Sequence, residues 1–454
     1  MEAQTIINEM ITKARVAQKT FEKYSQEQVD ACVREIAWSV YNNYEELAKR
    51  EYNETGMGNL SDKLSKNRVR PTVFWWHLKG KKSRGIIRRL DDKGLVELAK
   101  PMGVVGCIAP VTGAIVTPLH NMMCALKCGN SVIFSPHPAA VETSKYYMEL
   151  VNAALKKTGA PENLIQMVEN PTIELSRLVM ESCDISIATG GPGLVKAAYS
   201  SGKPSYGVGA GNDQCLVDRG RNFDEVAQMI IVSKTVENGI PCGSEQYTQC
   251  HRNDLESLIA AFERNGAYVL RNSEDIDKIR KTIFPNHEQN KAIVGRVPSV
   301  IAKQAGITIP ENTRLLVILV DTYGEEEDLA KEKLFPVMCL RAYDTWEDAV
   351  TVAQANLEVM GKGHSCMIHS DSQAHIEYAA ENIDVCRFGI NQSSSKCVGG
   401  TMLNCLAPTG TVGCGTWGNN TLSENLDYIH LMNVSRIVYE RKDAVVPSDE
   451  EVWG

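Results

Sequence analysis

One cysteine occupies a turn whose composition suits a nucleophile. Residues 238–246 read NGIPCGSEQ, so Cys242 follows a proline and precedes a glycine, just after a predicted helix. The thiolate is the reactive form of cysteine, and a loop gives it the access that reaction requires. The turn therefore predicts a thiol that forms a covalent bond to an electrophilic carbon. An inert thiol at a structural turn is the alternative that spacing alone leaves open.

A glycine-rich turn has the composition of a phosphate-binding loop. Residues 189–193 read TGGPG, follow a predicted strand and open a predicted helix. Gly190, Gly191 and Gly193 would let main-chain N–H groups approach a phosphate at the start of that helix. Lys196 takes the place of the third glycine of a GxGxxG motif, so a tight strand-to-helix turn without a ligand is the alternative.

A second turn after a strand reads SPHP at 135–138, and its two prolines make it rigid. Ser135 and His137 would lie at the carboxyl edge of the predicted sheet, where open α/β sheets bind their ligands. A histidine that only completes the loop is the alternative. These turns predict a ligand groove at one edge of a sheet.

Short apolar runs that alternate with amphipathic helices would position these turns. The first series has strands at 103–109, 131–135, 164–168, 184–188 and 214–218, and helices at 117–128, 143–157, 172–182, 193–200 and 223–235. The second has strands at 314–320, 337–342, 365–369 and 386–391, and helices at 253–264 and 345–356. This order predicts an α/β protein with doubly wound parallel sheets. Cys242 lies between the two series, where clefts form.

The remaining segments are of other kinds. Residues 1–55 show the apolar spacing of helices. Two apolar runs around an LDDKG turn predict a β-hairpin near 83–100. The acidic run at 325–328 predicts a solvated helix start, and the tail from about 426 to 454 ends in an extended, proline-containing segment.

Composition excludes several classes of protein. The chain has 454 residues, enough for two or three domains. Its 48 Lys and Arg against 56 Asp and Glu give a net charge of −8, which argues against nucleic acid or a membrane surface as partner. Residues 101–119 are uncharged, but three prolines in them argue against a membrane-spanning helix. No signal-like segment precedes the first predicted helix.

The 14 cysteines contain no CxxC and no spacing of the zinc type. They predict no metal site and a reducing, cytoplasmic compartment with mostly buried thiols. Cys124 and Cys128, the closest pair, lie in an apolar helical stretch and are expected to pack in the core.

Several motifs, taken together, resemble those of the CoA-acylating branch of the aldehyde dehydrogenase superfamily. They are ATGGPGLVKAAYSSGKPSYGVGAGN at 188–212, VENGIPCGSEQ at 236–246, SPHP at 135–138, EKLFPV at 332–337, GKGHS at 361–365 and GCGTWGNN at 413–420. The matches run in the family's order from about residue 10 to 435. The chain is identified as a member of this branch.

The resemblance implies the aldehyde dehydrogenase fold. It places a Rossmann-like cofactor domain at 1–235 and an α/β catalytic domain at 236–425. The hairpin at 83–100 and a C-terminal segment at 426–454 would form a small β element for oligomerisation. A homodimer or homotetramer is the expected assembly.

The resemblance also assigns roles to residues of the catalytic domain. Cys242 maps onto the family's nucleophile. His364, in GKGHS, would assist proton transfer or help to hold Cys242 as thiolate, with a packing histidine as the alternative. Glu332, in EKLFPV, would hold the nicotinamide ribose, with a solvated helix carboxylate as the alternative.

The same resemblance assigns the first domain to the cofactor. Ser135 and His137 would line the groove for the adenosine part of the nucleotide or of CoA. Gly190, Gly191 and Gly193 would face the pyrophosphate. NAD and NADP are both open as cofactors, with CoA as co-substrate and no metal.

The implied reaction oxidises an aldehyde through a thiohemiacetal and then a thioester on Cys242, which CoA releases as acyl-CoA in a reversible step. Gly207 stands where hydrolytic relatives carry the glutamate that activates water, so CoA is the expected acceptor. A hydrolytic enzyme, in which Gly207 only relaxes a turn, is the alternative.

The expected substrate is a small, anionic aldehyde, with succinate semialdehyde as first candidate. Sulfoacetaldehyde and short aliphatic aldehydes are the alternatives. Arg387 beside FGIN at 388–391, and Ser394 within SSSK at 393–396, would supply an anion-binding pocket unless they are surface residues.

One position departs from the family pattern. Family members commonly read PTTNP where this chain reads PVTGA at 110–114, so Gly113 replaces the asparagine that stabilises the oxyanion. Losing such a donor costs about 100- to 1,000-fold in rate. Either the Cys242 main-chain N–H and another group compensate, or the polar end of the substrate fills the space. A catalytically impaired assembly protein that keeps the fold is the third possibility.

Overall fold

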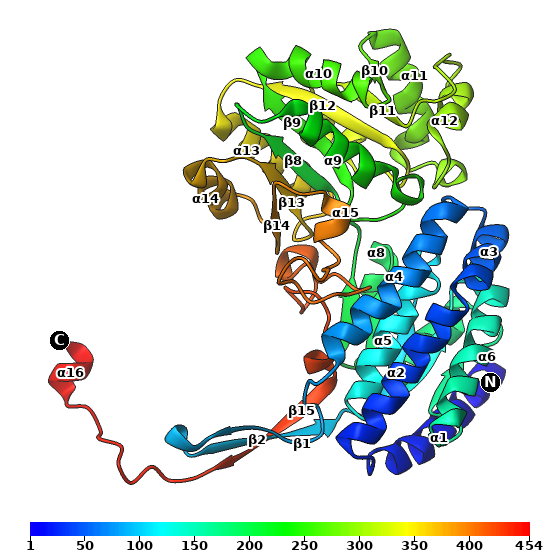
Figure 1. Cartoon of the computed structure of the whole chain (residues 1–454), viewed down its shortest axis with the longest axis vertical. Helices are drawn as coiled ribbons and strands as arrows, with labels where there is room; N and C mark the ends of the chain where they lie inside the picture. The colour runs from blue at the N-terminus through cyan, green and yellow to red at the C-terminus, as the bar shows by residue number, and fades with distance from the viewer.

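A computed structural model describes all residues, 1–454, as two lobes and a projecting arm (Figure 1). The first lobe is built on a five-stranded parallel sheet with the order β5-β4-β3-β6-β7. Its strands are β3 (Val104–Ile108), β4 (Ser131–Ser135), β5 (Ile165–Met167), β6 (Ile185–Thr189) and β7 (Ser205–Val208). Its helices are α1 (Glu2–Phe21), α2 (Gln26–Asn42), α3 (Tyr44–Thr55), α4 (Leu60–Leu78), α5 (Val116–Lys127), α6 (Val141–Lys157), α7 (Ile173–Ser182) and α8 (Pro192–Tyr199).

Helices cover both faces of this first sheet. One apolar core joins the sheet to α2, α4, α5 and α6, and a second joins it to α1, α7 and α8. Strands β3 and β4 are buried along their whole length, which explains why they read as uninterrupted small and apolar runs. Cys124 and Cys128 are buried in α5 and at its end, as predicted.

The second lobe is built on a seven-stranded parallel sheet with the order β10-β11-β12-β9-β8-β13-β14. Its strands are β8 (Asp213–Val217), β9 (Glu245–His251), β10 (Ala267–Leu270), β11 (Leu315–Leu319), β12 (Val337–Tyr343), β13 (Cys366–His369) and β14 (Phe388–Ile390). Its helices are α9 (Phe223–Thr235), α10 (Leu255–Arg264), α11 (Ser273–Ile283), α12 (Pro298–Gln304), α13 (Trp346–Val359), α14 (Gln373–Asn382) and the short α15 (Ser394–Cys397).

The two sheets confirm the predicted α/β architecture but correct one assignment. The first predicted series ends with the strand at 214–218, whereas β8 pairs with β9 and β13 in the second sheet. Apolar periodicity identifies a buried strand without saying which sheet it joins. Helix α9 belongs to the second lobe together with β8, since Val226 and Ile230 pack in the core of that lobe. The chain therefore changes sheet at residues 209–212, ahead of the predicted boundary at 235.

Two other departures have physical reasons. Strand β9 was not predicted because it reads EQYTQCH, although most of it is fully buried. The acidic run at 325–328 forms two short 3₁₀ turns, and the prediction that it is solvated is wrong for Glu327, which is 1 % exposed. Arg280 donates from Nε and Nη2 to the two Glu327 carboxylate oxygens, each at 2.8 Å. This ion pair offsets the free-energy cost of burying the carboxylate.

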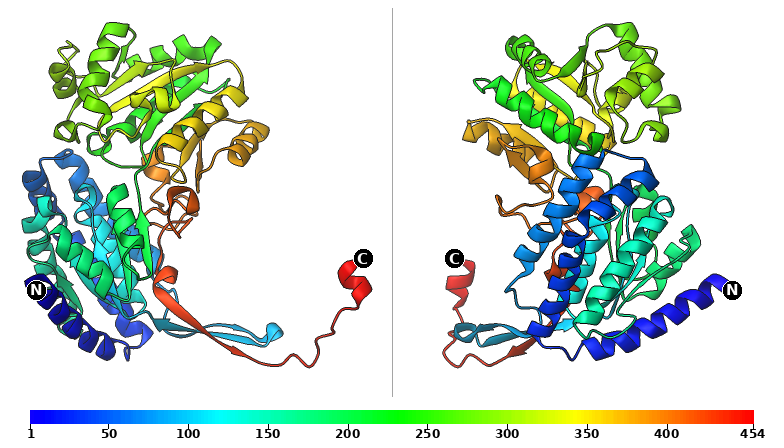
Figure 2. Two further views of the ribbon diagram at one scale, coloured as in Figure 1. Left: turned by 180° about the vertical axis from the view of Figure 1, so that it is seen from behind. Right: turned by 45° about the vertical axis from the view of Figure 1, so that its right-hand side comes forward.

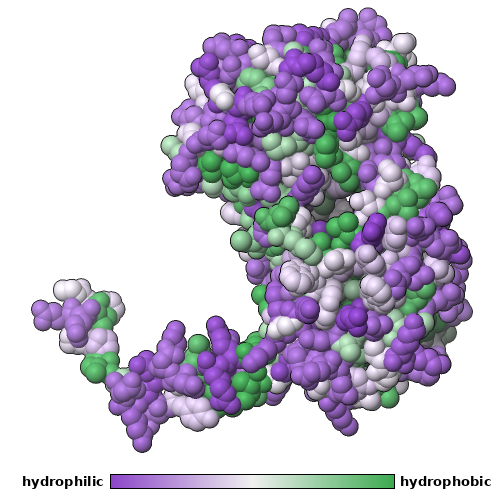
Figure 3. All heavy atoms as spheres, viewed as in Figure 1, coloured by the Kyte–Doolittle hydropathy of each residue, from purple (hydrophilic) through white to green (hydrophobic).

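The arm is a three-stranded antiparallel sheet that stands away from both lobes (Figure 2). Strands β1 (Gly85–Leu90) and β2 (Leu95–Pro101) form the predicted hairpin, and β15 (Met432–Val438) pairs with the other side of β2. The chain then extends to α16 (Asp449–Trp453), and the space-filling view shows this tail clear of the lobes (Figure 3). No helix is long and apolar enough to cross a membrane.

The chain returns from the second lobe to complete the first. Leu422, Leu426 and Leu431 lie in the core of the first lobe, with α2, α5 and α6. Asn130 Nδ2 donates to the Leu431 carbonyl at 2.8 Å, which ties this returning segment to the loop before β4. The second lobe is thus an insertion between two parts of the first.

Candidate active site

The turn before Cys242 has a strained backbone. Glu237, Asn238 and Gly239 are consecutive residues with φ of 46°, 53° and 80°. The left-handed conformation costs a residue with a side chain about 1 kcal/mol. Asn238 Nδ2 donates to the carbonyls of Gly58 and Gly295, each at 2.9 Å. The first lobe and a neighbouring loop thus hold the turn in a shape that the isolated segment would not keep.

A buried ion network holds the same turn from the side of α3 and α4. Lys66 Nζ lies 2.5 Å from the Glu237 carboxylate and 3.4 Å from that of Glu51, and Lys63 Nζ lies 3.3 and 3.1 Å from the same two groups. Lys63, Glu51 and Glu237 are at most 2 % exposed. The two lysines hold the pKa of Glu51 below its usual value although burial alone would raise it. The network joins the lobes directly behind the cysteine.

We expect Glu237→Gln to lower both the stability of the fold and the rate of the reaction. The substitution leaves the buried lysines with one carboxylate, and breaking a buried pair costs about 3 kcal/mol. The loss of turn geometry should also lower kcat by about tenfold or more. Urea unfolding and steady-state kinetics measure the two effects. Glu46→Gln is the matched control, since it removes a carboxylate from an exposed pair with Arg50. Equal behaviour of the two variants would contradict the prediction.

Cys242 lies partly exposed at the end of this turn. Burial first, and then the nearby Glu332 carboxylate, raise the pKa of its thiol to about 12, against the opposing effect of the Cys242 and Gly243 N–H groups. The thiol is therefore protonated at neutral pH until a base takes its proton. A base near the sulfur is therefore required.

The raised pKa of Cys242 predicts slow alkylation without cofactor. The rate with iodoacetamide should rise about tenfold per pH unit from pH 7 to 10 without a plateau, because the thiolate fraction is still growing. Peptide mass spectrometry follows this site beside the exposed Cys405, which serves as internal reference. A faster reaction of Cys242 than of Cys405 at pH 7 would contradict the prediction, because it would mean that the Cys242 thiol is already ionised without cofactor.

Gly211 links Cys242 to Glu332. A Cβ on Gly211 would overlap the Cys242 carbonyl, so the two backbones are in direct contact. Glu332 Oε1 accepts a hydrogen bond of 2.9 Å from the Gly211 N–H. Burial raises the pKa of Glu332 to about 7, against the opposing effect of that N–H. Glu332 is 9 % exposed, so it is not the solvated carboxylate of the alternative interpretation.

His364 approaches the same place from another turn. The turn that leads to His364 lies against Asn212, the residue after Gly211, because a Cβ on Gly361 would overlap Asn212. The His364 N–H donates to the Gly361 carbonyl at 3.1 Å and so closes this turn. His364 is fully buried, with Nδ1 2.8 Å from Ser365 Oγ and with no partner for Nε2. Burial, and then the charge of Arg387, lower its pKa to about 3. Its imidazole is therefore neutral and has one nitrogen free.

Arg387 and Ser394 do not form the predicted anion pocket. Arg387 is 5 % exposed, and its Nη1 and Nη2 donate to the carbonyls of His364 and Gly413, both at 2.6 Å. Ser394 is buried, and its hydroxyl donates to Asp213. Both side chains direct their donors at the protein, and neither lies at the surface. Arg387 instead fixes the main chain of the His364 turn.

The residues predicted to bind the nucleotide lie at one edge of the first sheet. Strands β4 and β6 flank β3, and Ser135 and the 190–193 turn follow their carboxyl ends. A Cβ added to Gly191 or Gly193 would meet no atom within 4 Å, so space is open in front of α8. This is the space that the pyrophosphate was predicted to occupy.

Ser135 and His137 differ in exposure. Ser135 is buried, with its Oγ 2.9 Å from that of Ser176. His137 is exposed, and its Nδ1 accepts a hydrogen bond of 3.1 Å from the Ala139 N–H, which caps the next 3₁₀ turn. His137 therefore presents its ring at the edge of the groove, while Ser135 supports the loop from inside.

The comparisons with known proteins agree with this geometry. The sequence profile of the aldehyde dehydrogenase family matches residues 2–402. This chain belongs to the aldehyde dehydrogenase family. It is 46 % identical over 454 residues, the whole of both chains, to succinate-semialdehyde dehydrogenase (acetylating) of Clostridium kluyveri. It is 34 % identical to sulfoacetaldehyde dehydrogenase (acylating) of Bilophila wadsworthia, over 99 % of this chain and 98 % of that protein.

A solved structure supports the same family at the level of the fold. The acetylating aldehyde dehydrogenase from Geobacillus thermoglucosidasius superposes with a TM-score of 0.94 and 35 % identity, over 99 % of each chain. The predicted family and fold are therefore confirmed, and the protein is an oxidoreductase that acts on aldehyde groups.

The Tyr199 ring packs beside Gly207, the position that the resemblance aligns with the glutamate of hydrolytic relatives. A Cβ on Gly207 would lie 3.0 Å from Cε2 of Tyr199. The Tyr199 hydroxyl also accepts from the Gly207 N–H at 3.1 Å and lies 3.2 Å from its carbonyl, to which it donates. A glutamate at Gly207 would have to displace this ring. Gly207 thus leaves room for the Tyr199 ring, and it also has no side chain that could activate water.

Thr117 likewise fills the space beside Gly113. Gly113 is buried at the end of a 3₁₀ turn, and a Cβ there would lie 2.5 Å from Thr117 Oγ1. The asparagine common in the family would collide with this hydroxyl. An asparagine at this position therefore requires the Thr117 side chain to move.

We expect Gly113→Asn to change the rate or the substrate preference only when Thr117 is shortened as well. The single variant should lose about 1–3 kcal/mol of stability through overpacking, and Gly113→Asn with Thr117→Ala should recover it. Thermal unfolding and kcat/KM over a panel of aldehydes measure both effects. If the double variant matched the parent with every aldehyde, the position would lie outside the oxyanion site.

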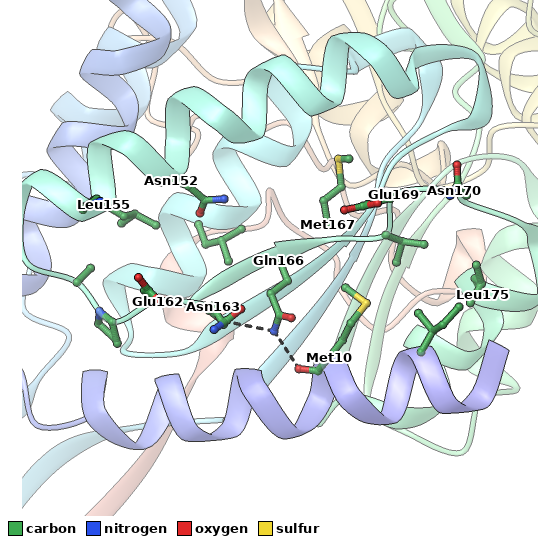
Figure 4. A pocket seen from close by; sticks show the side chains of 16 residues that line it. Met10, Asn152, Leu155, Glu162, Asn163, Gln166, Met167, Glu169, Asn170 and Leu175 are labelled. Carbon is green, nitrogen blue, oxygen red and sulfur yellow. Dashed lines mark hydrogen bonds between the residues drawn. The ribbon is translucent and has the colours of Figure 1, made fainter. Parts of the chain in front are cut away.

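One surface cavity is remote from these residues. It measures about 710 Å³ and lies between α1, α6 and β5 (Figure 4). Gln166 extends into it and donates to the Met10 carbonyl at 2.9 Å. None of the predicted catalytic or cofactor residues lines it, so it is not part of the candidate active site.

Sequence reasoning missed the residues that position the cysteine. Glu237 and Asn238 belong to the VENGIPC motif, but their partners Lys63 and Gly58 lie far away in the chain. Gly211 stands out in the sequence only as part of a longer motif. A run of polar residues in a position that must be buried, as in β9, is the signal that could have indicated an internal polar network.

Proposed function

We propose that this enzyme oxidises a small aldehyde to its acyl-CoA, with NAD or NADP as hydride acceptor, and that it also catalyses the reverse reaction. The observation that carries the proposal is the contact of Gly211 with Cys242, with Glu332 and with Gly361 of the turn that leads to His364, together with the tyrosine packing at Gly207 in place of a water-activating carboxylate. The acetylating and acylating names of full-length relatives support CoA as the acceptor.

Cys242 attacks the aldehyde carbon after its proton has passed to a base. His364 is the candidate base, because its Nε2 is buried and free. The main-chain N–H groups beside the sulfur are available to the oxyanion of the thiohemiacetal. When bound, the nicotinamide supplies the hydride acceptance that leaves a thioester on Cys242.

Release of the acyl group requires a second thiol. The CoA thiol loses its proton as it attacks the thioester, and His364 is the candidate acceptor of that proton as well. Glu332 holds Gly211, and through it the Cys242 turn, and it would also contact the nicotinamide ribose. The open turn at Gly191 and Gly193 would receive the pyrophosphate.

Succinate semialdehyde is the first substrate candidate, because the relative with 46 % identity over the whole chain carries that name. Sulfoacetaldehyde is the second, from a full-length relative with 34 % identity. Both are small anionic aldehydes. Since Arg387 is engaged with main-chain carbonyls, the cation for the substrate's anionic end must come from another residue.

Formation of NADH or NADPH with and without CoA tests the reaction. The panel is succinate semialdehyde, sulfoacetaldehyde, propanal and acetaldehyde, and mass spectrometry identifies the product. We expect product formation to require CoA and to yield the thioester. Equal rates without CoA, with a free acid as product, would show a hydrolytic enzyme instead.

We also propose that the arm mediates self-association into a homodimer or homotetramer. Its outer strands β1 and β15 each have one edge without a partner strand. The tail exposes Val438, Tyr439, Val445, Val446 and Trp453, each more than half exposed. A second copy would cover these surfaces. Light scattering of the full chain measures the mass, and a monomer at micromolar concentration would refute the proposal.

A further inference from the structure

Two carboxyl groups lie together inside the second lobe, and the steps above do not use them. Asp213 on β8 and Glu245 on β9 are fully buried and are direct partners in the parallel ladder. Asp213 Oδ1 and Glu245 Oε2 have no hydrogen-bond partner. Two carboxylates this close in a dry interior cannot both ionise, so the pair holds at least one proton at neutral pH.

Main-chain and hydroxyl donors account for the remaining oxygens. The Ser394 hydroxyl donates to Asp213 Oδ2, and the Ser394 N–H donates to Glu245 Oε1 at 3.1 Å. The Ser365 hydroxyl also faces the Asp213 carboxyl, and the Ser233 hydroxyl faces Glu245. The two free oxygens are therefore left to share a proton with each other.

Ser365 connects this pair to His364. Its Oγ lies 2.8 Å from His364 Nδ1. A hydroxyl that donates to a carboxylate has only its lone pairs left for a second neighbour, so Nδ1 must carry a proton and donate to Ser365. Nε2 is then the unprotonated nitrogen, and it is the one that is buried without a partner. The carboxyl pair thus selects the tautomer in which Nε2 can accept a proton.

We propose that Asp213 and Glu245 form a proton store that acts on the thiols through Ser365 and His364. This inference rests on the proposed function. The S–H bond of Cys242 or CoA breaks and an N–H bond forms at Nε2. The Nδ1 proton passes to Ser365 Oγ, the Ser365 proton passes to the Asp213 carboxyl, and the proton that Asp213 already carried passes to the Glu245 carboxylate. One proton moves from the thiol to the pair, no electrons are transferred, and the reverse sequence returns it.

The electrostatics agree with this role. Burial, and for Asp213 also the charge of Glu245, raise the pKa of Asp213 well above its usual value, and burial raises the pKa of Glu245 to about 7. The other titratable groups that face the pair or His364 are Lys234 on α9, Arg387 before β14, and the thiols of Cys215, Cys366 and Cys397.

These neighbours do not replace the pair as proton acceptors. Burial lowers the pKa of Lys234 well below its usual value, and raises the pKa of each of the three thiols. Lys234 Nζ is bound to Gln246, Ser244 and the Lys333 carbonyl. Arg387 donates to main-chain carbonyls.

The pH dependence of kcat in Asp213→Asn and Ser365→Ala tests the relay. With wild-type enzyme, CoA and the best aldehyde, kcat should rise with pH as the pair loses its second proton. We expect each variant to lower kcat by about 100-fold with the aldehyde KM within threefold, and to remove this acid limb. Ser365→Thr, which keeps the hydroxyl, should restore both. An infrared band of a protonated carboxyl should disappear in Asp213→Asn, independently of turnover.

Ser370→Ala is the matched control. It removes another buried serine–aspartate hydrogen bond, of 2.6 Å to Asp218, just beyond β13. It should leave the acid limb in place. Ser365→Ala loses no charge, so it keeps the test available if Asp213→Asn fails to fold. Wild-type enzyme without CoA-dependent activity would refute the proposed function. An active wild type whose Ser365→Ala variant keeps kcat within twofold and an unchanged acid limb would overturn the relay alone.

Discussion

Cys242→Ala is expected to abolish aldehyde oxidation, with a loss in kcat of about 10⁴-fold or more. No other thiol can replace it, because the neighbouring Cys414 is buried and burial raises its pKa to about 12. Removal of the nucleophile in an enzyme with a covalent intermediate leaves only the contribution of binding and oriented donors. Reduction of NAD or NADP in the presence of CoA measures the loss.

Two further measurements separate chemistry from folding. Intact-protein mass spectrometry of the parent, incubated with aldehyde and cofactor but without CoA, should show one acyl adduct, and the variant should show none. Cys386→Ala is the matched control, since Cys386 is the other partly exposed cysteine and lies just before β14. An adduct that persists in Cys242→Ala would place the nucleophile elsewhere.

Gly211→Ala is expected to lower kcat by about 100-fold while the protein stays folded. The new Cβ would overlap the Cys242 carbonyl, so the catalytic turn must move, and a displacement near 1 Å costs about that factor. The same shift loosens the contact between the Gly211 N–H and Glu332. Overpacking at one position costs about 1–3 kcal/mol, which a domain of this size tolerates.

Gly209→Ala is the matched control for this prediction. It lies two residues earlier in the same crossing between lobes, and its Cβ would meet its nearest neighbour, Val195, at an ordinary 3.9 Å. We expect it to keep kcat within about threefold. Single-turnover hydride transfer should be slow in Gly211→Ala alone. Parallel behaviour of the two variants would mean that the crossing segment, not contact with Cys242, determines the rate.

The predictable parts of the site were those that lie within one stretch of chain. The VENGIPCGSEQ motif identifies Cys242 by itself, and GKGHS identifies the turn of His364. The partners of these residues come from other elements, so their contacts depend on register and packing. Asp213 faces Glu245 only because β8 joins the second sheet, which the strand pattern did not reveal.

The same limit explains why the two residues predicted to bind the substrate do not form an anion pocket. Arg387 and Ser394 were assigned by charge and by proximity to a motif, while their actual partners are the His364 carbonyl and Asp213. A buried arginine must satisfy its donors, and main-chain carbonyls were nearer than any ligand. Thr117 beside Gly113 shows the same limit, since only the folded chain brings its hydroxyl to that glycine.

The insertion of the second lobe into the first has a consequence for biosynthesis. All strands of the second sheet lie between residues 213 and 390, so this lobe leaves the ribosome as a continuous piece. Helix α5, buried at every position, is made earlier but is covered in part by the 3₁₀ turn at Tyr428–Leu431, which is translated only after the whole second lobe. The half of the protein that is synthesised first therefore completes its core last, and until then it carries an apolar helix that chaperones can recognise.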